Sequence, residues 1–279
     1  MNNDWLTDEQ RDELLALLED DDRMTSEYPK VAEYFESAPR LAGTGNTRED
    51  AAFDLRLLYY MTSQINQEIN AYWEIVSPLV NNRSGKPVID GGAPNGSPRL
   101  SFAQMILQEV FAYAVPSPKT IQWIRANTGN KTILELGAGR GYWAKEIRNV
   151  GLNIEAYDIE PPNFSGNTSF PQSGKQVDVW HEVKATDNDA DMFKNSPDSV
   201  LFLCWPPGWE NRMAVQSLKS FESKGGTKLI YIGEPKGGKT ANNEFFSALS
   251  ARWKLVSVDR NFVTWWNLED QAQIWVRQA

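Results

Sequence analysis

The segment Thr132-Ile-Leu-Glu-Leu-Gly-Ala-Gly-Arg-Gly-Tyr142 carries the strongest chemical signal in the chain, because three closely spaced glycines follow an apolar run. Gly137, Gly139 and Gly141 let the backbone turn tightly and approach a ligand, and a helix that starts after them offers free N–H groups. Asp158 follows 21 residues after Gly137. A carboxylate at the end of the next strand accepts hydrogen bonds from both hydroxyls of a ribose. The spacing therefore predicts a site for a ribose-containing cofactor.

A second segment, Val200-Leu-Phe-Leu-Cys-Trp-Pro-Pro-Gly-Trp209, ends a later apolar run with aromatic residues and two prolines. Trp205 and Trp209 offer flat surfaces on which a planar group can stack. The following apolar run ends in Tyr231-Ile-Gly-Glu234, and the carboxylate of Glu234 is the best general-base candidate in the chain. Because the carboxyl ends of parallel strands meet at one edge of a sheet, we expect Glu234 and the tryptophans to face one crevice.

The elements that must position these residues alternate from residue 119 onward. Such strand–helix alternation predicts a mostly parallel α/β sheet of seven strands, covered on both faces. The expected strands are Thr132–Leu136, Ile154–Tyr157, Val177–Val183, Val200–Cys204, Leu229–Ile232, Leu255–Val258 and Ile274–Val276, and the expected helices include Tyr142–Asn149, Ala190–Asn195, Glu210–Glu222 and Asn243–Trp253.

The first 80 residues predict a helical region. Thr7 and Gln10 form a capping-box pattern before a leucine-rich acidic helix. Thr47 is expected to cap a longer helix that runs until Pro78. Residues 81–98 contain four glycines and three prolines, which is typical of a loop. We therefore expect a helical region with an acidic arm over 1–80, a linker or loop over 81–100, and the main domain over 101–279.

At this point the chain resembles the class I S-adenosylmethionine-dependent methyltransferases over about residues 110–279, on the acid-plus-three-glycines loop, the acid after the second strand and the seven-strand pattern. The resemblance implies a Rossmann-like sheet and S-adenosyl-L-methionine as cofactor. It implies that Glu135 orients the loop and approaches the methionine ammonium, and that Asp158 holds the ribose. It also implies that further residues line the cofactor: Gly137, Ala138, Gly139 and Gly141 in the loop, Ile159 against the adenine, and Asp187 at the adenine amine.

Two further segments resemble elements of the amino-methyltransferases. Ser117-Pro118-x-x-Ile121-x-x-Ile124 is similar to the element that holds the methionine end of the cofactor, although a proline-marked helix start has the same pattern. Trp205, Pro206, Pro207 and Trp209 stand where that group carries (Asp/Asn)-Pro-Pro-(Tyr/Phe), which implies a role in binding the methyl acceptor.

Trp205 departs from that pattern in a way that matters chemically. Its indole has only a donor N–H, so it cannot accept a hydrogen bond from an exocyclic amine as asparagine does. This departure speaks against methylation of adenine N6 or cytosine N4, which stays as an alternative. The favoured acceptor is a small aromatic or base-like group. The combination of Leu-x-Trp-Pro-Pro and Tyr-x-Gly-Glu resembles a less familiar group of methyltransferase-like proteins.

Two other functions compete with methyl transfer. The first is a fold kept as a cofactor-binding module without turnover, in which the N-terminal helices serve a protein complex. The second is a P-loop nucleotidase, because Gly233–Thr240 satisfies the pattern GxxxxGK[ST]. Only 39 residues follow that segment, and Asp259 is its sole candidate for a magnesium-binding acid.

Composition excludes several kinds of site. The single cysteine, Cys204, and the single histidine, His181, exclude a disulfide framework and a Cys/His zinc site, and no metal site is predicted. His181 is a possible general base, although a lone histidine at the end of a strand is more often a half-buried polar residue. Apolar runs are too short for a bilayer-spanning helix, which needs about 20 residues, and no secretory signal is visible. We therefore expect a soluble, cytoplasmic protein that makes no membrane contact.

The net charge of −9 is unevenly distributed, since residues 1–22 hold nine acids and one base. The main domain is therefore nearly neutral, and a nucleic-acid partner stays open through a local basic patch. We expect a small-molecule or base-like acceptor, with partner or dimer contacts through the N-terminal helices. The patch would consist of Arg83, Lys86, Arg99, Lys236 and Lys239.

Overall fold

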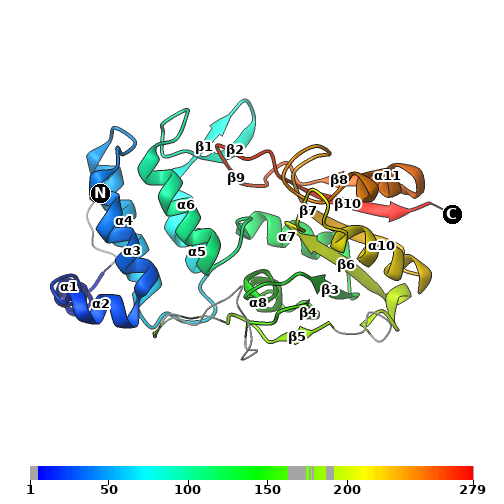
Figure 1. Cartoon of the computed structure of the whole chain (residues 1–279), viewed down its shortest axis with the longest axis horizontal. Helices are drawn as coiled ribbons and strands as arrows, with labels where there is room; N and C mark the ends of the chain where they lie inside the picture. Colours follow the sequence, from blue (N-terminus) through cyan, green and yellow to red (C-terminus); the bar gives the residue numbers. More distant parts are fainter. Residues whose placement is uncertain (1–5, 163–173, 176, 178, 187–191, 279) are drawn as a thin grey trace.

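The computed structural model describes residues 6–162, 174–175, 177, 179–186 and 192–278. Figure 1 shows an elongated molecule with a helical N-terminal region at one end and a sheet with its covering helices at the other. The chain begins at the helical end, and its C terminus lies at the sheet end.

Seven strands form the main sheet in the order β5-β4-β3-β6-β7-β10-β8. All are parallel except β10, which is antiparallel to both β7 and β8. This is the doubly wound order, with a reversed last strand inserted beside the edge strand. The predicted fold class, a Rossmann-like seven-stranded α/β sheet with a helical N-terminal region, is confirmed. The strands are β3 Thr132–Leu136, β4 Ile154–Asp158, β5 Val183–Ala185, β6 Ser199–Cys204, β7 Lys228–Gly233, β8 Trp253–Val258 and β10 Gln271–Arg277.

Side chains that alternate along the central strands build two cores, one on each face of the sheet. Ile133 and Phe202 pack on one face against α7 Pro118–Thr128 and α8 Tyr142–Asn149. Leu134 and Leu201 pack on the other face against α10 Met213–Ser223 and α11 Asn243–Arg252. Burial on both faces explains why the central strands read as continuous apolar runs.

The N-terminal region contains six α-helices among the described residues. The capping box at Thr7 and Gln10 is confirmed. The prediction of one long helix between Thr47 and Pro78 is wrong, since residues 63–70 are not helical and divide it into two helices. Asn46 and Asn70, rather than Thr47, supply the N-caps of the two helices that result. The helices are α1 Asp8–Leu18, α2 Asp21–Glu27, α3 Pro29–Ser37, α4 Thr47–Thr62, α5 Ala71–Val76 and α6 Pro98–Val110.

The segment expected as a linker over 81–100 forms regular structure instead. Strands β1 Val80–Arg83 and β2 Lys86–Ile89 make a hairpin, and β9 Thr264–Trp265 extends it into a three-stranded sheet. Ser84 and Gly85 both have positive φ, as a two-residue hairpin turn requires, so the residue types that predicted a loop build this turn.

The predicted domain boundary at residue 101 also needs correction. Helix α6 starts at Pro98 and buries Leu100 and Leu107 in one core with the earlier helices. That core also takes in Tyr142 from α8 and Trp265 from β9. Packing therefore continues from the helical region into the sheet domain without a linker.

Two expectations concern the segment after β4. The predicted strand Val177–Val183 is wrong in position, because within the described part of this segment the only strand is β5, Val183–Ala185. The predicted helix Ala190–Asn195 lies partly outside the described residues. No helix in the described part of the chain is both long and apolar enough to span a membrane.

Candidate functional site

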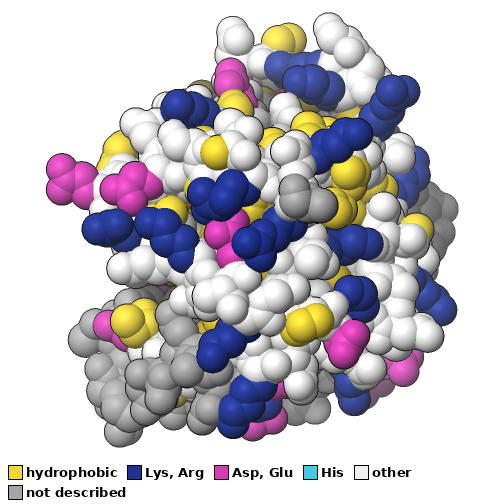
Figure 2. Space-filling model, turned by 90° about the vertical axis from the view of Figure 1, so that its right-hand side faces the viewer, with side chains coloured by type: hydrophobic (Ala, Val, Ile, Leu, Met, Phe, Trp, Pro, Cys, Tyr) yellow, Lys and Arg dark blue, Asp and Glu magenta, His cyan; other side chains and the backbone are white. Residues whose placement is uncertain are grey.

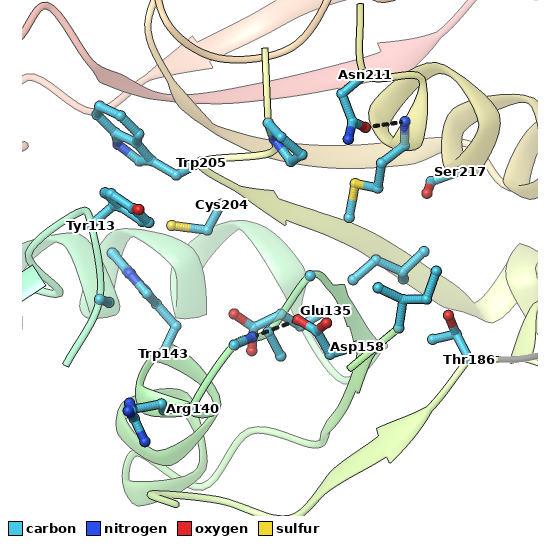
Figure 3. Close-up of a pocket in the computed structure, with 18 of the residues that line it drawn as sticks. Tyr113, Glu135, Arg140, Trp143, Asp158, Thr186, Cys204, Trp205, Asn211 and Ser217 are labelled. Carbon is cyan, nitrogen blue, oxygen red and sulfur yellow. Dashed lines mark hydrogen bonds between the residues drawn. The ribbon is translucent and has the colours of Figure 1, made fainter. Parts of the chain in front are cut away.

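A cavity of about 640 Å³ opens at the carboxyl ends of β3, β4 and β6. The segment between α6 and α7 and the start of α10 complete its wall. Figure 3 shows that the cavity has two unlike ends. Tyr113, Trp143 and Trp205 gather at one end, and Asp158 and Thr186 lie at the other.

The glycine loop forms the middle of the wall. Gly137 and Gly139 have φ of 73° and 56°, a conformation that glycine adopts without strain. A Cβ at Gly137 would lie 2.8 Å from the terminal methyl of Met213, a flexible side-chain end that can move aside, so the positive φ is the stronger reason for glycine there. Gly137, Ala138 and Gly139, the loop residues expected to line the cofactor, all line the cavity.

Gly141, the third glycine of the loop, lies outside the cavity wall, and the structure does not bring it together with Gly137 and Gly139 there. It is the N-cap of α8 with φ of 77°, and a Cβ there would lie 2.9 Å from the carbonyl oxygen of His181. The glycine lets the chain enter α8 against the segment before β5. His181 also lies outside the cavity wall.

Glu135 lines the cavity from the end of β3 and is 2% exposed. Its Oε2 has no hydrogen-bond partner. Burial, and secondly the charge of Asp158, raise the pKa of Glu135 to about 8. An unpartnered buried carboxyl group is costly unless a donor or cation meets it, so this position fits the ammonium group of a ligand.

Asp158 ends β4 at the polar end of the cavity. Its Oδ2 accepts a hydrogen bond from Gly139 N at 2.9 Å, and its Oδ1 accepts one from Glu160 N at 3.0 Å. Burial raises the pKa of Asp158. Ile159 lies at the rim with 83% of its surface exposed. Thr186 lines the same end, and the predicted adenine contact Asp187 lies outside the described residues.

Trp205 and Tyr113 form the aromatic end. Their rings stack with centroids 5.3 Å apart and planes 12° apart. The Trp205 backbone has a φ of 52°, and its Nε1 donates to Asp270 Oδ2 at 2.9 Å. Burial raises the pKa of Asp270 to about 6. Since the single indole N–H is already engaged, Trp205 offers the cavity an aromatic face and no free donor.

Only part of the segment that follows Trp205 reaches the cavity. Pro207 lines the cavity, whereas Pro206 and Trp209 do not. Trp209 is 85% exposed, so its predicted role as the second stacking surface needs correction. The chain turns outward because residues 206–208 pack against the loop before α11, where Ala241 N donates to Pro206 O at 2.9 Å.

Glu234 also lies outside the cavity wall, which corrects its prediction as general base. Its Oε2 accepts from Lys239 N at 2.6 Å, and its Oε1 accepts from Glu269 N at 3.3 Å. The carboxylate therefore fills the concave side of the loop 233–240 that satisfies the P-loop pattern. The Thr240 hydroxyl, which a P-loop would offer to magnesium, is hydrogen-bonded to Tyr231 Oη at 2.7 Å. This geometry argues against the nucleotidase hypothesis.

Ser117 and Pro118 start a helix and do not reach the cavity wall. The buried Ser117 hydroxyl accepts from Thr120 N at 3.2 Å, as an N-cap does. Thr120 in turn donates to Asp259 at 2.8 Å. The predicted grip on the methionine end is therefore corrected to a helix cap.

Sequence reasoning missed more than half of the cavity wall. Most of these residues lie between the end of α6 and α7 or around the start of α10, and the others come from the glycine loop, α8 and the residue after β5. A local signal existed for Arg140 and Trp143, which lie in or next to the glycine motif, and for Cys204, which precedes Trp205. The missed residues include Gln108, Glu109, Tyr113, Arg140, Trp143, Thr186, Asn211, Arg212, Gln216 and Ser217.

Comparisons with known proteins give structural likenesses only. No family model matches the chain, and no curated protein matches it. A structure of magnesium protoporphyrin IX methyltransferase from Synechocystis PCC 6803 with bound SAM is similar, at 12% identity and a TM-score of 0.35, over 57% of this chain and 76% of that chain.

Two further methyltransferase structures are similar at the same level. The 1,6-didemethyltoxoflavin-N1-methyltransferase of Burkholderia thailandensis matches at 13% identity and a TM-score of 0.39, over 72% of this chain and 99% of that chain. The CcbJ methyltransferase of Streptomyces caelestis matches at 12% identity and a TM-score of 0.36, over 58% and 89%. The strand order of the sheet identifies the fold without these likenesses.

Proposed function

We propose that the chain is an S-adenosylmethionine-dependent methyltransferase whose acceptor is a small molecule or base-like group with a flat or apolar surface. One observation supports the proposal above all. A single cavity joins a glycine loop, an unpartnered buried carboxyl group and an aromatic end. The polar end suits the nucleoside of the cofactor, and the aromatic end suits the acceptor.

The cofactor would be held by residues whose chemistry matches its parts. Glu135 would meet the ammonium group, Asp158 the ribose hydroxyls, and Ile159 the adenine. Gly137 and Gly139 keep side chains away from the middle of the cavity. When bound, the cofactor supplies an electrophilic methyl group, whose transfer depends on in-line positioning of the acceptor.

The acceptor would bind against Tyr113 and Trp205. Because these rings stack directly on each other, each covers one face of the other, so a planar acceptor would meet an outer face of the pair rather than a slot between two rings. Trp143 is fixed beside them, since its Nε1 donates to Ala114 O at 3.1 Å. Rigid aromatic surfaces bind planar groups by stacking, at about 1–3 kcal/mol for each base-like ring.

The deciding experiment is transfer of a tritiated methyl group from S-adenosylmethionine into fractionated cell extract. We expect label in the small-molecule fraction with the wild-type chain and loss of label with Asp158→Ala. Isothermal titration with S-adenosylhomocysteine provides the binding control. Absence of binding by the wild-type chain would contradict the proposal at its first step.

The binding-module hypothesis keeps one specific support, because Glu234 lies outside the cavity and the Trp205 N–H is engaged. Cofactor binding without label in nucleic acid, protein or small-molecule pools would favour that module. The nucleic-acid alternative loses part of its expected patch, since Arg83 pairs with Asp90 and Arg99 pairs with Asp54.

A further inference from the structure

The end of the sheet opposite to the cavity is strongly basic. Figure 2 shows this face, where Lys and Arg side chains outnumber Asp and Glu. The strand pairing brings Lys228, Lys254 and Arg277 to the same edge, because Val276 of β10 lies opposite Lys228 and Lys254. Lys131 precedes β3, and Lys224 lies in the turn before β7. We call Lys131, Lys224, Lys228, Lys254 and Arg277 the basic row.

Three cations of the basic row are held in place by backbone carbonyl groups without being neutralised. Lys131 Nζ donates to Pro197 O at 2.7 Å, and Lys228 Nζ donates to Asn127 O at 2.7 Å. Arg277 Nη1 donates to Glu222 O at 2.9 Å. Within the part of the chain that the structure describes, no carboxylate forms an ion pair with a member of the row. The row therefore presents fixed positive charge to solvent.

The cations of the basic row also repel one another. Burial, and secondly the charge of Lys131, lower the pKa of Lys228. The nearby carboxylate of Glu222 is already engaged by Arg252 at 3.0 Å. A bound anionic surface would relieve this repulsion, so the row fits a partner with several closely spaced acids.

The strand beside the row adds apolar surface. β8 is the last strand of the sheet, and its outer edge has no neighbour among the described strands. Leu255, Val256 and Val258 on this strand are 39%, 51% and 39% exposed. An edge of this kind is a common place for a second chain to dock.

The chain itself carries a surface with the opposite properties. We call residues 8–22 the acidic arm, in which α1 and the start of α2 expose every acid and also Leu15 and Leu18, at 57% and 41%. Helix α1 has 11 residues and is therefore about 16 Å long. The five strands along the basic row span about 19 Å. The acids of the arm are Asp8, Glu9, Asp12, Glu13, Glu19, Asp20, Asp21 and Asp22.

We propose that the acidic arm of one copy of this chain docks on the basic row and the exposed β8 edge of a second copy. Charge, length and apolar content agree between the two surfaces. Within one molecule they lie at opposite ends of the longest axis, so they meet only between copies (Figure 1). Because the two surfaces lie at opposite ends of the molecule, the contact joins copies head to tail, and the smallest assembly that forms it is a dimer. The proposal does not depend on the proposed function.

The test uses the full chain and measures mass by sedimentation equilibrium at about 50 mM and 500 mM salt. We expect a mass of at least twice 31.6 kDa at low salt and near 31.6 kDa at high salt. The row variant is Lys131→Glu/Lys224→Glu/Lys254→Glu, and the arm variant is Asp12→Lys/Glu13→Lys/Glu19→Lys. Each should raise the dimer dissociation constant by about tenfold or more when measured alone.

Mixing the row variant with the arm variant should restore the dimer, because both contacts are again of opposite charge. Lys86→Glu/Lys119→Glu/Lys236→Glu is the matched control, with the same change of charge elsewhere, and it should dimerise like the wild type. Circular dichroism checks the fold of each variant, and the salt dependence of the wild type needs no variant.

Three outcomes would overturn the proposal. The first is a wild-type chain that stays monomeric at low salt, and the second is a mixture that does not re-form the dimer. The third is a monomer that binds a labelled single-stranded oligonucleotide through the basic row, which would assign the surface to nucleic acid. The chain's net charge of −9 makes us expect no such binding.

Discussion

Because Glu135 is buried and has a raised pKa, ligand binding in the cavity should depend on pH. With a pKa of about 8, its carboxyl group is mostly protonated at neutral pH in the free protein. A ligand ammonium group favours the ionised form, so binding below pH 8 releases a proton. We therefore expect the affinity for S-adenosylhomocysteine to rise with pH up to about 8, by at most about tenfold per pH unit. Calorimetry in buffers of different ionisation enthalpy measures both the affinity and the proton release.

Glu135→Gln is the matched variant for this prediction, because it keeps the shape and removes the titration. Its affinity should be weaker than that of the wild type at pH 8 and should change little between pH 6 and 8. Equal pH profiles for the two proteins would show that Glu135 does not meet the cation.

The same shift makes a separate prediction about stability. The pKa of Glu135 lies near 4.5 in an unfolded chain and is about 8 in the folded protein, so the unfolded state binds fewer protons between these values. The contribution of Glu135 to the free energy of unfolding is therefore full below about pH 4.5 and is lost as pH rises towards 8. In urea unfolding, the free energy of unfolding of Glu135→Gln should rise relative to that of the wild type over this pH range. A constant difference between the two proteins would exclude the shift.

Tyr113 is the residue that separates acceptor binding from cofactor binding. Tyr113→Ala removes one ring of the stacked pair and should raise the acceptor KM about 5- to 150-fold, which corresponds to about 1–3 kcal/mol. The dissociation constant for S-adenosylhomocysteine should stay nearly constant. Trp209→Ala is the control, since that ring is exposed outside the cavity, and it should change neither quantity. A large increase of the acceptor KM in Trp209→Ala would mean that the acceptor binds near Trp209 instead.

At the scale of elements, the glycine loop shows where backbone geometry is obligatory. Gly141 and Gly151 have nearly the same φ, 77° and 80°. A Cβ at Gly141 meets the His181 backbone, whereas a Cβ at Gly151 meets nothing within 4 Å. Gly151→Ala should therefore cost only the positive φ, about 1–2 kcal/mol. Gly141→Ala should cost at least about 1 kcal/mol more because of the clash.

Chemical denaturation measures both costs in the same units. The difference between the two variants isolates the contact with the segment before β5, because the strain of the left-handed conformation is common to both. Equal free energies of unfolding would mean that this segment moves aside freely when α8 needs room.

These elements also show how far sequence can predict a site. The loop from Glu135 to Gly139 and the acid Asp158 were predictable because strand, glycines and acid follow one another locally. Trp209 and Glu234 were misplaced because their positions depend on contacts between residues 206–208 and the loop before α11, which no local pattern encodes. The hairpin over 80–89 was missed because glycine and proline are equally typical of loops and of tight turns.

At the scale of the whole molecule, the helical region and the sheet domain share one core. Tyr142 of α8 shows the connection, since its hydroxyl accepts from Tyr72 N at 3.0 Å and donates to Asn70 Oδ1 at 3.0 Å. Tyr72 is in the first turn of α5, so a side chain of the sheet domain caps a helix of the N-terminal region. Trp265 of β9 also donates to the Tyr72 hydroxyl, at 3.2 Å. The predicted division at residue 101 cuts through these contacts.

Unfolding should therefore be one cooperative transition for the whole chain. Tyr142→Phe leaves the buried N–H of Tyr72 without its partner and should lower the free energy of unfolding by about 1–3 kcal/mol. Tyr157→Phe is the control, because its hydroxyl bonds Glu155 on the same strand, near the surface, and its loss should cost less than about 1 kcal/mol. Far-ultraviolet circular dichroism reports mainly the helices, and tryptophan fluorescence reports both regions. We expect the two probes to give coincident urea transitions that shift together in Tyr142→Phe. Two separate transitions, or equal costs for the two variants, would mean that the helical region folds independently of the sheet.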